Sequence, residues 1–372
     1  MKKVIVLCFL FLCFFSVVVK AEEQQEMITE QIEKLPLYDV DRQIKEIWKK
    51  GDLPSFRECI QQSIEKGNFI DIKALFSWIL KKMAGEMTTQ ISMIKKIFFV
   101  VLLSAILKNI NSSFQGKSVG ELGFYVCYMV LVVVMTATFY RQADMVGKTI
   151  KDVETFFKAM MPVFMTLSIA SGSYETVTAS VTMTGAGILT NIVCNVVLPA
   201  IIMMVSLEMI NNISEKPMLS HFTKLFQEGI AWGMKGIAFL FMALLSIQKL
   251  GGNIVNQGLG KTAKAVVTAV PVVGDVMGGA VDTAAALTGM IRGGTLLTTV
   301  IFLVLLCAVP FIRLAIMILL YKVTAALAEP ICETRLVKCI SSAGDFSALL
   351  LGALFLAECM FLFSSILLLT FF

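Results

Sequence analysis

The sequence is poor in charged residues and contains a single histidine. Charged side chains make up 16% of its 372 residues, well below the roughly 25% that is usual in soluble proteins. The one histidine, His221, stands alone beside Ser220, and no HExxH, GxSxG or complete P-loop pattern occurs. We therefore expect neither catalytic residues nor a cofactor, and the protein is not predicted to be an enzyme.

Basic residues and cysteines also fail to form recognisable sites. The net charge of +5 comes from scattered Lys and Arg residues without a basic block, so nucleic acid is not an expected partner. The nine cysteines include no CxxC pair, which argues against a zinc site. Most of them lie in apolar blocks, where cysteine usually packs as a small hydrophobic residue.

What the sequence has in abundance is apolar residues. Hydrophobic residues make up 57% of the chain, and several blocks approach the ~20 apolar residues that a helix needs to cross a bilayer. Seven such blocks follow the N-terminal region: residues 97–110, 122–140, 157–170, 188–210, 230–247, 295–321 and 347–372. The predicted fold class is an all-α, polytopic integral membrane protein with about seven spans, in contact with membrane lipid.

The N-terminal region has the pattern of a secretory signal. Residues 1–21 comprise a short basic start, an apolar core and a Val-Lys-Ala end that resembles a cleavage site after Ala21. An uncleaved anchor is the alternative. Residues 22–90 are charged and helical in pattern, and we expect them to form a short extracytoplasmic or interfacial helical segment. Residues 91–372 form the predicted polytopic membrane domain.

The order of the spans leaves the orientation open. If the signal is removed and all seven blocks cross, the predicted loop at residues 141–158 lies outside, although it carries four basic residues. The later basic loops around Lys216 and Arg335 then lie outside as well, against the tendency of basic loops to stay in the cytoplasm. If block 97–110 does not cross, all three loops face the cytoplasm.

An eighth apolar stretch, residues 265–290, is interrupted by Gly and Pro. Its sequence, AVVTAVPVVGDVMGGAVDTAAALTGM, contains Pro271, Gly274, Asp275 and Asp282, and the two aspartates are seven apart, on one helix face. A re-entrant pair of half-helices turning at Pro271 and Gly274 explains most of these features. An interfacial hairpin with both aspartates in water, or a single crossing, remains an alternative. Irregular backbone at membrane depth requires a protein cover or a watery cavity.

Two further groups of polar residues fall inside predicted spans. Arg313 and Glu358 lie deep in their blocks and have opposite charges. Because an isolated charge at the bilayer centre costs at least ~2.5–3.5 kcal/mol, we predict that they form a buried ion pair. Asn191 and Asn195 are four apart and form a polar stripe, which more often bridges helices than binds substrate.

Three segments together resemble the stage III sporulation protein AE family. They are IFFVVLLSAILKNINSSFQ at 97–115, FFKAMMPVFMTLSIASGS at 156–173 and VPVVGDVMGGAVDT at 270–283. The last is the most specific, because it combines the PVVG turn with the VDT sequence. The resemblance extends over nearly the whole chain, from the signal through the helical segment to the membrane domain.

This resemblance implies a role in endospore formation. It implies a permease-like, multi-pass component of the channel, or feeding-tube, complex between mother cell and forespore, located in the mother-cell membrane around the forespore. The implied partners are other membrane proteins of the same operon, its ATPase and ring-forming components, and a forespore-side partner. Two functions remain open: a conduit, and a non-conducting scaffold that anchors the ring proteins and the ATPase.

Overall fold

The computed structural model describes residues 28–47, 55–66, 72–113, 117–170, 176–213, 219–268 and 273–370 of the chain. Within these ranges every regular element is helical, in agreement with the predicted all-α class. The elements are α2 (Tyr38–Ile47), α3 (Phe56–Lys66), α4 (Ile72–Ser113), α5 (Lys117–Ala170), α6 (Thr176–Ile192), the π-helical turn η1 (Val193–Val197), α7 (Leu198–Asn211), α8 (Ser220–Thr268), α9 (Val273–Ala328) and α10 (Thr334–Thr370).

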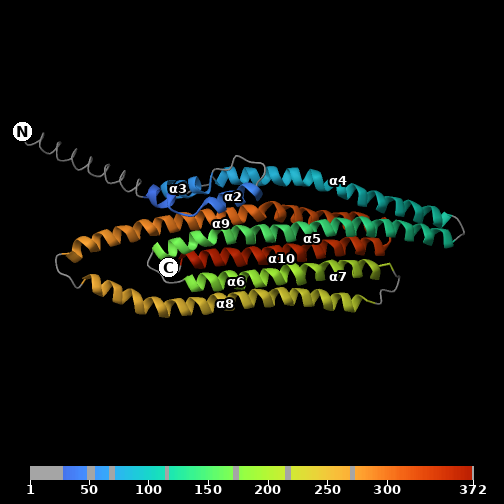
Figure 1. The fold of residues 1–372 in the computed structure, drawn as a ribbon. Helices are drawn as coiled ribbons and strands as arrows, with labels where there is room; N and C mark the ends of the chain where they lie inside the picture. Colours follow the sequence, from blue (N-terminus) through green and yellow to red (C-terminus); the bar gives the residue numbers. More distant parts are fainter. Residues whose placement is uncertain are drawn as a thin grey trace, which may run out of the picture.

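The long helices run side by side along one axis, so the molecule is elongated (Figure 1). Helix α10 is central and contacts α9, α5, α7, α8 and α6. On one side α4 packs against α5 and α9, and on the other side α8 packs against α6 and α7. The short N-terminal helices α2 and α3 lie on α5 and α9, respectively.

The helices are much longer than a bilayer is thick. At 1.5 Å per residue, the 54 residues of α5 and the 56 residues of α9 extend over roughly 81 and 84 Å. The hydrocarbon core of a bilayer measures only about 30 Å. Six helical stretches of the described chain are long and apolar enough to cross a membrane: Met83–Ile106, Leu122–Ala170, Ser180–Asn211, Ser220–Ile247, Ala286–Ala328 and Thr334–Leu369.

The loop predicted at residues 141–158 is wrong, because this segment is the middle of α5. Val146 and Ile150 face the core, whereas the charged residues lie on the outer side. Two pairs at i,i+4 spacing support this outer side: Lys148 with Asp144 at 2.7 Å and Lys158 with Glu154 at 2.6 Å. The segment is thus an amphipathic helix. The two spans predicted at 122–140 and 157–170 belong to one helix, which reduces seven candidate spans to six.

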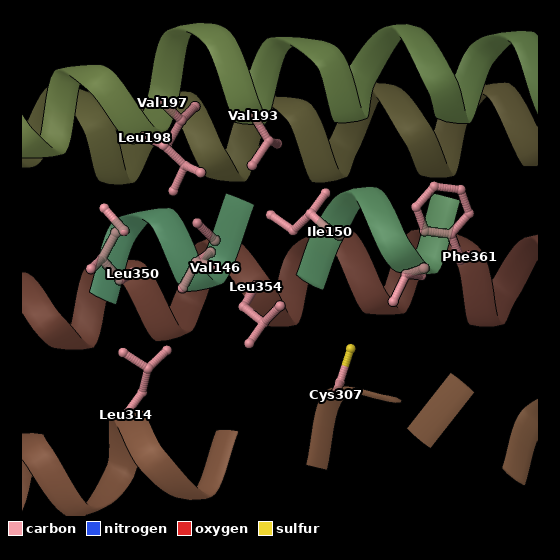
Figure 2. Close-up of a cluster of buried hydrophobic side chains, with 14 of the residues drawn as sticks. Val146, Ile150, Val193, Val197, Leu198, Cys307, Leu314, Leu350, Leu354 and Phe361 are labelled. Carbon is pink, nitrogen blue, oxygen red and sulfur yellow. The ribbon is translucent and has the colours of Figure 1, made fainter. Parts of the chain in front are cut away.

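Buried hydrophobic side chains from several helices meet around α10 in the centre of the bundle (Figure 2). They include Val146 and Ile150 of α5, Val193 and Val197 of η1, Leu198 of α7, Cys307 and Leu314 of α9, and Leu350, Leu354 and Phe361 of α10. Because α10 is enclosed by other helices, much of its apolar surface serves the protein core. Where α10 lies within the bilayer, this core is stabilised by close packing of side chains, because lipid tails are as apolar as the side chains themselves.

The span predicted at residues 188–210 lies in a rod formed by α6, η1 and α7. The rod widens at η1, where the Leu198 N–H donates to the Val193 carbonyl five residues earlier. Pro199 follows at the start of α7. Proline has no N–H and cannot continue the α-helical pattern, and a π-turn is a common way to accommodate such a break.

The described part of the predicted segment 22–90 is helical, but it does not form a separate layer above the bundle. Ser55 begins α3 with a capping box, since the Glu58 N–H donates to Ser55 Oγ and the Ser55 N–H donates to Glu58 Oε2. Phe56 then inserts its ring 5.4 Å from that of Phe302 in α9. The N-terminal helices are therefore part of the same core.

Helix α4 crosses the predicted boundary at residue 90 without a break. It begins at Ile72 and ends at Ser113, and the candidate span within it begins at Met83. The predicted signal peptide, residues 1–21, lies outside the described residues.

Candidate functional site: a polar layer across the bundle

Arg313 of α9 and Glu86 of α4 form an ion pair in the middle of the bundle. Arg313 Nε donates to Glu86 Oε2 at 2.9 Å, and Nη2 donates to Oε1 at 2.6 Å. This two-pronged geometry is among the strongest ways in which arginine binds a carboxylate. The Glu86 side chain is 13% exposed and that of Arg313 is 38% exposed, so the carboxylate is largely covered by protein whereas the arginine is partly accessible.

The predicted ion pair between Arg313 and Glu358 is not the one that forms. Glu358 is buried on α10, against the thiol of Cys307 on α9. Residues 307 and 313 are six apart, which corresponds to roughly 9 Å along the helix axis. Arg313 instead faces α4, which supplies Glu86.

Glu86 was missed because it belongs to the segment assigned to the soluble region. One signal could have found it: large apolar residues continue at helical spacing upstream of the first predicted block. These residues are Leu80, Met83, Met87 and Ile91, all exposed on α4. An apolar stripe at such spacing predicts that the membrane helix begins before residue 91.

A second set of polar contacts connects α5, α9 and α10. Ser347 Oγ donates to Gln142 Oε1 at 2.9 Å, and Gln142 Nε2 donates to the Tyr321 hydroxyl at 3.3 Å. All three side chains are buried. Together with the ion pair they form what we call the polar layer: Glu86, Arg313, Gln142, Tyr321 and Ser347. Glutamine, tyrosine and serine are too common in helices for the sequence to have indicated this network.

A cavity of about 270 Å³ opens beside the polar layer, between α4, α5 and α9. It is lined by Thr89, Gln90, Thr138, Arg141, Gln142, Met145, Arg313 and Met317. Six of these eight residues are polar, although most of the surface that they expose to the cavity is apolar, so a few polar groups are set in an apolar wall. Within the described ranges, no group of three or more His, Cys, Asp or Glu residues is placed to hold a metal ion.

Asn191 and Asn195 lie exposed on α6 and η1, and Asn195 Nδ2 donates to Asn191 Oδ1. The predicted stripe is therefore present as a bonded amide pair, whereas its role in bridging helices stays a prediction. The residue next to it, Val196, lines an apolar groove of about 430 Å³ between α6, α7 and α8. Gly229 and Gly233 of α8 form part of the opposite wall.

The stretch at residues 265–290 spans the end of α8 and the beginning of α9. Helix α8 extends to Thr268 and α9 begins at Val273, and the predicted turn at Pro271 falls between these bounds, outside the described residues. Gly274, Asp275 and Asp282 fall in the first turns of α9, and Pro271 lies outside the described residues. The environment of these side chains is not part of the described structure, and the re-entrant arrangement stays a prediction.

The polar layer and the six candidate spans belong to a chain with recognisable relatives. The family model for stage III sporulation protein AE matches residues 54–371, which is most of the chain. The chain belongs to the stage III sporulation protein AE family. The curated Stage III sporulation protein AE of Bacillus subtilis (strain 168) is 21% identical over 301 residues, covering 79% of this chain and 73% of that relative. No solved structure matches the chain.

Membership of the stage III sporulation protein AE family confirms the resemblance that the sequence indicated. The matched region begins before α3 and ends with α10, so it includes the whole polar layer and its cavity. The protein is therefore a sporulation protein, and its apolar helices support a multi-pass membrane protein.

Proposed function

We propose that this member of the stage III sporulation protein AE family is the permease-like component of the channel complex between mother cell and forespore. It acts in the mother-cell membrane around the forespore. Its partners are the other membrane proteins of the same operon, its ATPase and ring-forming components, and a forespore-side partner. Family membership supports the sporulation role, and the six candidate spans support the membrane placement.

The polar layer is the observation that carries the permease-like role. Buried polar groups in an apolar bundle cost free energy unless they are hydrogen-bonded. Replacing a buried ion pair by apolar residues is often neutral or stabilising, so stability alone does not require such a pair. A layer of charges and amides beside a cavity suits a protein that admits a polar solute among its helices.

The fold also supports one orientation. The last residues of α4, α7 and α9 and the first residues of α5, α8 and α10 lie at the same end of the bundle (Figure 1). Arg335 Nη1 donates to the Ile213 carbonyl at 3.1 Å and joins the start of α10 to the chain just after α7 there. Basic residues of the described helices near this end include Lys224, Arg335 and Lys338. If the signal is removed, this end faces the cytoplasm, which satisfies the positive-inside tendency while α4 also crosses.

The conduit function is tested by removing the charges of the polar layer while preserving its size. The double variant Glu86→Gln with Arg313→Gln keeps much of the hydrogen-bonding capacity but deletes both charges. We expect it to accumulate and to recruit its partners normally, whereas late forespore gene expression fails. The matched control is Arg42→Gln with Glu46→Gln, an exposed pair on α2, and it should sporulate like the parent.

The same experiment can also contradict the conduit function. If the double variant supports late forespore gene expression as well as the parent does, the charges serve structure alone, and the permease-like role loses its main support. If accumulation falls, the ion pair is needed for folding, and the charge-swapped pair Glu86→Arg with Arg313→Glu then decides whether orientation of the charges matters to passage.

A scaffold is the alternative function, and the apolar groove favours it. A Cβ added at Gly229 or Gly233 would meet nothing within 4 Å, so α8 presents small residues on an open face. Small residues within spans allow close approach of another helix. We assign the groove to a transmembrane helix of a partner, because Gly229 and Gly233 leave room for close helix contact and the exposed amide pair Asn191–Asn195 adjoins the groove residues Ile192 and Val196 in the chain. For a scaffold, Gly233→Leu should abolish partner recruitment and sporulation together.

Asp275 and Asp282 are a second candidate lining of the conduit. The proposal rests on their position in an apolar stretch interrupted by Gly274 and Pro271. Asp275→Asn and Asp282→Asn remove the charge with little change in size, and on the conduit hypothesis each should block late forespore gene expression after normal assembly. If both variants sporulate like the parent, this stretch does not line the path.

A further inference from the structure

The cavity between α4, α5 and α9 has the composition of an anion-binding site. Two arginines, Arg141 and Arg313, belong to its lining, and they supply positive charge to a wall that is otherwise mainly apolar. Glu86 is bonded to Arg313 through both carboxylate oxygens and balances one of the two positive charges. One positive charge is therefore left for a ligand.

Arg313 keeps part of its donor capacity free for that ligand. Its Nε and Nη2 donate to Glu86, but Nη1 meets only the Met145 sulfur at 3.4 Å. A thioether is a weak acceptor. Glu86 fixes the plane of the guanidinium group, and the Nη1 edge is held beside Met145, which lines the cavity. Because the Arg313 side chain is already ordered, it loses little further conformational entropy when a ligand binds.

Arg141 provides the second wall. It is exposed and has no hydrogen bond or ion pair with any residue in the described part of the chain. Thr138 and Met145 lie on the same face of α5 as Arg141, three residues before it and four after it, so the helix register turns the Arg141 side chain to the cavity. Gln142 is held in place by Ser347 and Tyr321, which gives the cavity a rigid floor.

The lining disfavours the other classes of ligand. A metal cation or an ammonium group would face two arginines and a carboxylate that is already bonded. A purely apolar ligand would offer no partner to Gln90, which is buried, or to Arg141. A phosphate offers at least three acceptor oxygens, enough for both guanidinium groups and an amide.

We propose that this cavity binds a phosphate group between Arg141 and the Nη1 edge of Arg313. The phosphate is borne by a free ion or metabolite, or by the headgroup of a membrane phospholipid. Arg141 directly follows the apolar block 122–140 of α5, so both sources reach the cavity if that block crosses the bilayer. Phosphate binding deepens the proposed function. The binding itself is independent of that function, and only the use that the cell makes of the ligand rests on it.

Binding is measured on the purified full-length protein, independently of sporulation. In neutral detergent, inorganic phosphate is titrated against sodium chloride of equal ionic strength, and thermal unfolding and calorimetry are recorded. A second arm compares nanodiscs of phosphatidylcholine with nanodiscs that also contain phosphatidylglycerol. The test variant is Arg141→Gln. The matched control is Lys151→Gln, an exposed residue on the same helix that does not line the cavity.

We expect Arg141→Gln to weaken phosphate binding about tenfold or more, as loss of a charge-assisted contact does, whereas Lys151→Gln binds like the parent. If Arg141→Gln abolishes only the stabilisation by phosphatidylglycerol, the lipid headgroup is the source of the phosphate. Loss of the inorganic phosphate effect identifies the free ion. The proposal is overturned if neither probe binds, or if both variants weaken binding equally. Its failure leaves the sporulation tests of the polar layer unaffected.

Discussion

Arg313 lies deep in an apolar helix, and the free-energy cost of its charge there depends on which carboxylate faces it. The sequence predicts a partner by depth and sign, and these criteria select Glu358. The structure supplies Glu86, because α4 packs against α9 in a register that brings the two side chains together. Helix pairing and register depend on the packing of many side chains, and they are not encoded in the spacing of two charged residues.

A double-mutant cycle distinguishes the two partners. Arg313→Gln alone should destabilise the protein by roughly 1–3 kcal/mol, less than for a fully buried pair, because it leaves Glu86 charged and unpaired. Adding Glu86→Gln should recover part of that loss, whereas adding Glu358→Gln should give a strictly additive effect. Thermal unfolding of the purified protein measures both cycles. Coupling of Arg313 to Glu358, and not to Glu86, would contradict the ion pair between Arg313 and Glu86.

At the scale of the helices, the sequence predicts apolar content well and continuity poorly. Every predicted apolar block lies in a helix, because apolar periodicity is a property of local sequence. The two blocks of α5 look like separate spans since charged residues stand between them. They join because those residues occupy one side of a helix whose other side carries Val146, Ile150 and Val153. The number of charged residues does not reveal that the helix is continuous, whereas their distribution over the two sides of the helix does.

The docking of α3 on α9 depends on a single glycine. A Cβ at Gly294 would lie 2.7 Å from Ile64 Cγ1 and 3.3 Å from the Ile60 carbonyl. Next to this contact, Ser63 and Thr298 share a hydrogen bond of 3.2 Å. We therefore expect Gly294→Val to push α3 away from α9 and to expose the N-terminal helices to protease.

The neighbouring glycine is the matched control for this contact. A Cβ at Gly293 would meet nothing within 4 Å, so Gly293→Val changes the same helix with the same residue but leaves α3 in place. Limited proteolysis of membranes that contain each variant should show faster cleavage near α3 in Gly294→Val alone. Equal cleavage of the two variants would mean that the close approach at Gly294 does not hold α3.

At the scale of the molecule, the bundle is too long to be enclosed by one bilayer. Helices of roughly 81–84 Å greatly exceed an apolar core of about 30 Å, even with ordinary tilt. Composition predicts a membrane protein, but it does not show that apolar residues also fill a core that extends along the bundle. Central α10 illustrates this point, since its apolar residues pack on five neighbouring helices. Hydropathy alone therefore does not locate the bilayer along the axis.

The exposed charges of α5 locate it by experiment. If block 122–140 crosses the bilayer and the signal is removed, Lys148→Cys should react with an impermeant thiol reagent in intact protoplasts of vegetative cells that express the protein. Lys338→Cys, at the opposite end, should react only after permeabilisation, and lipid-facing Val130→Cys should not react in either case. Native Cys59 is expected to add little background, because burial raises the pKa of its thiol to about 12 and leaves almost no thiolate at pH 7–8. Labelling of Lys148→Cys only after permeabilisation would invert the orientation, and labelling of Val130→Cys would move the bilayer to the other apolar block of α5.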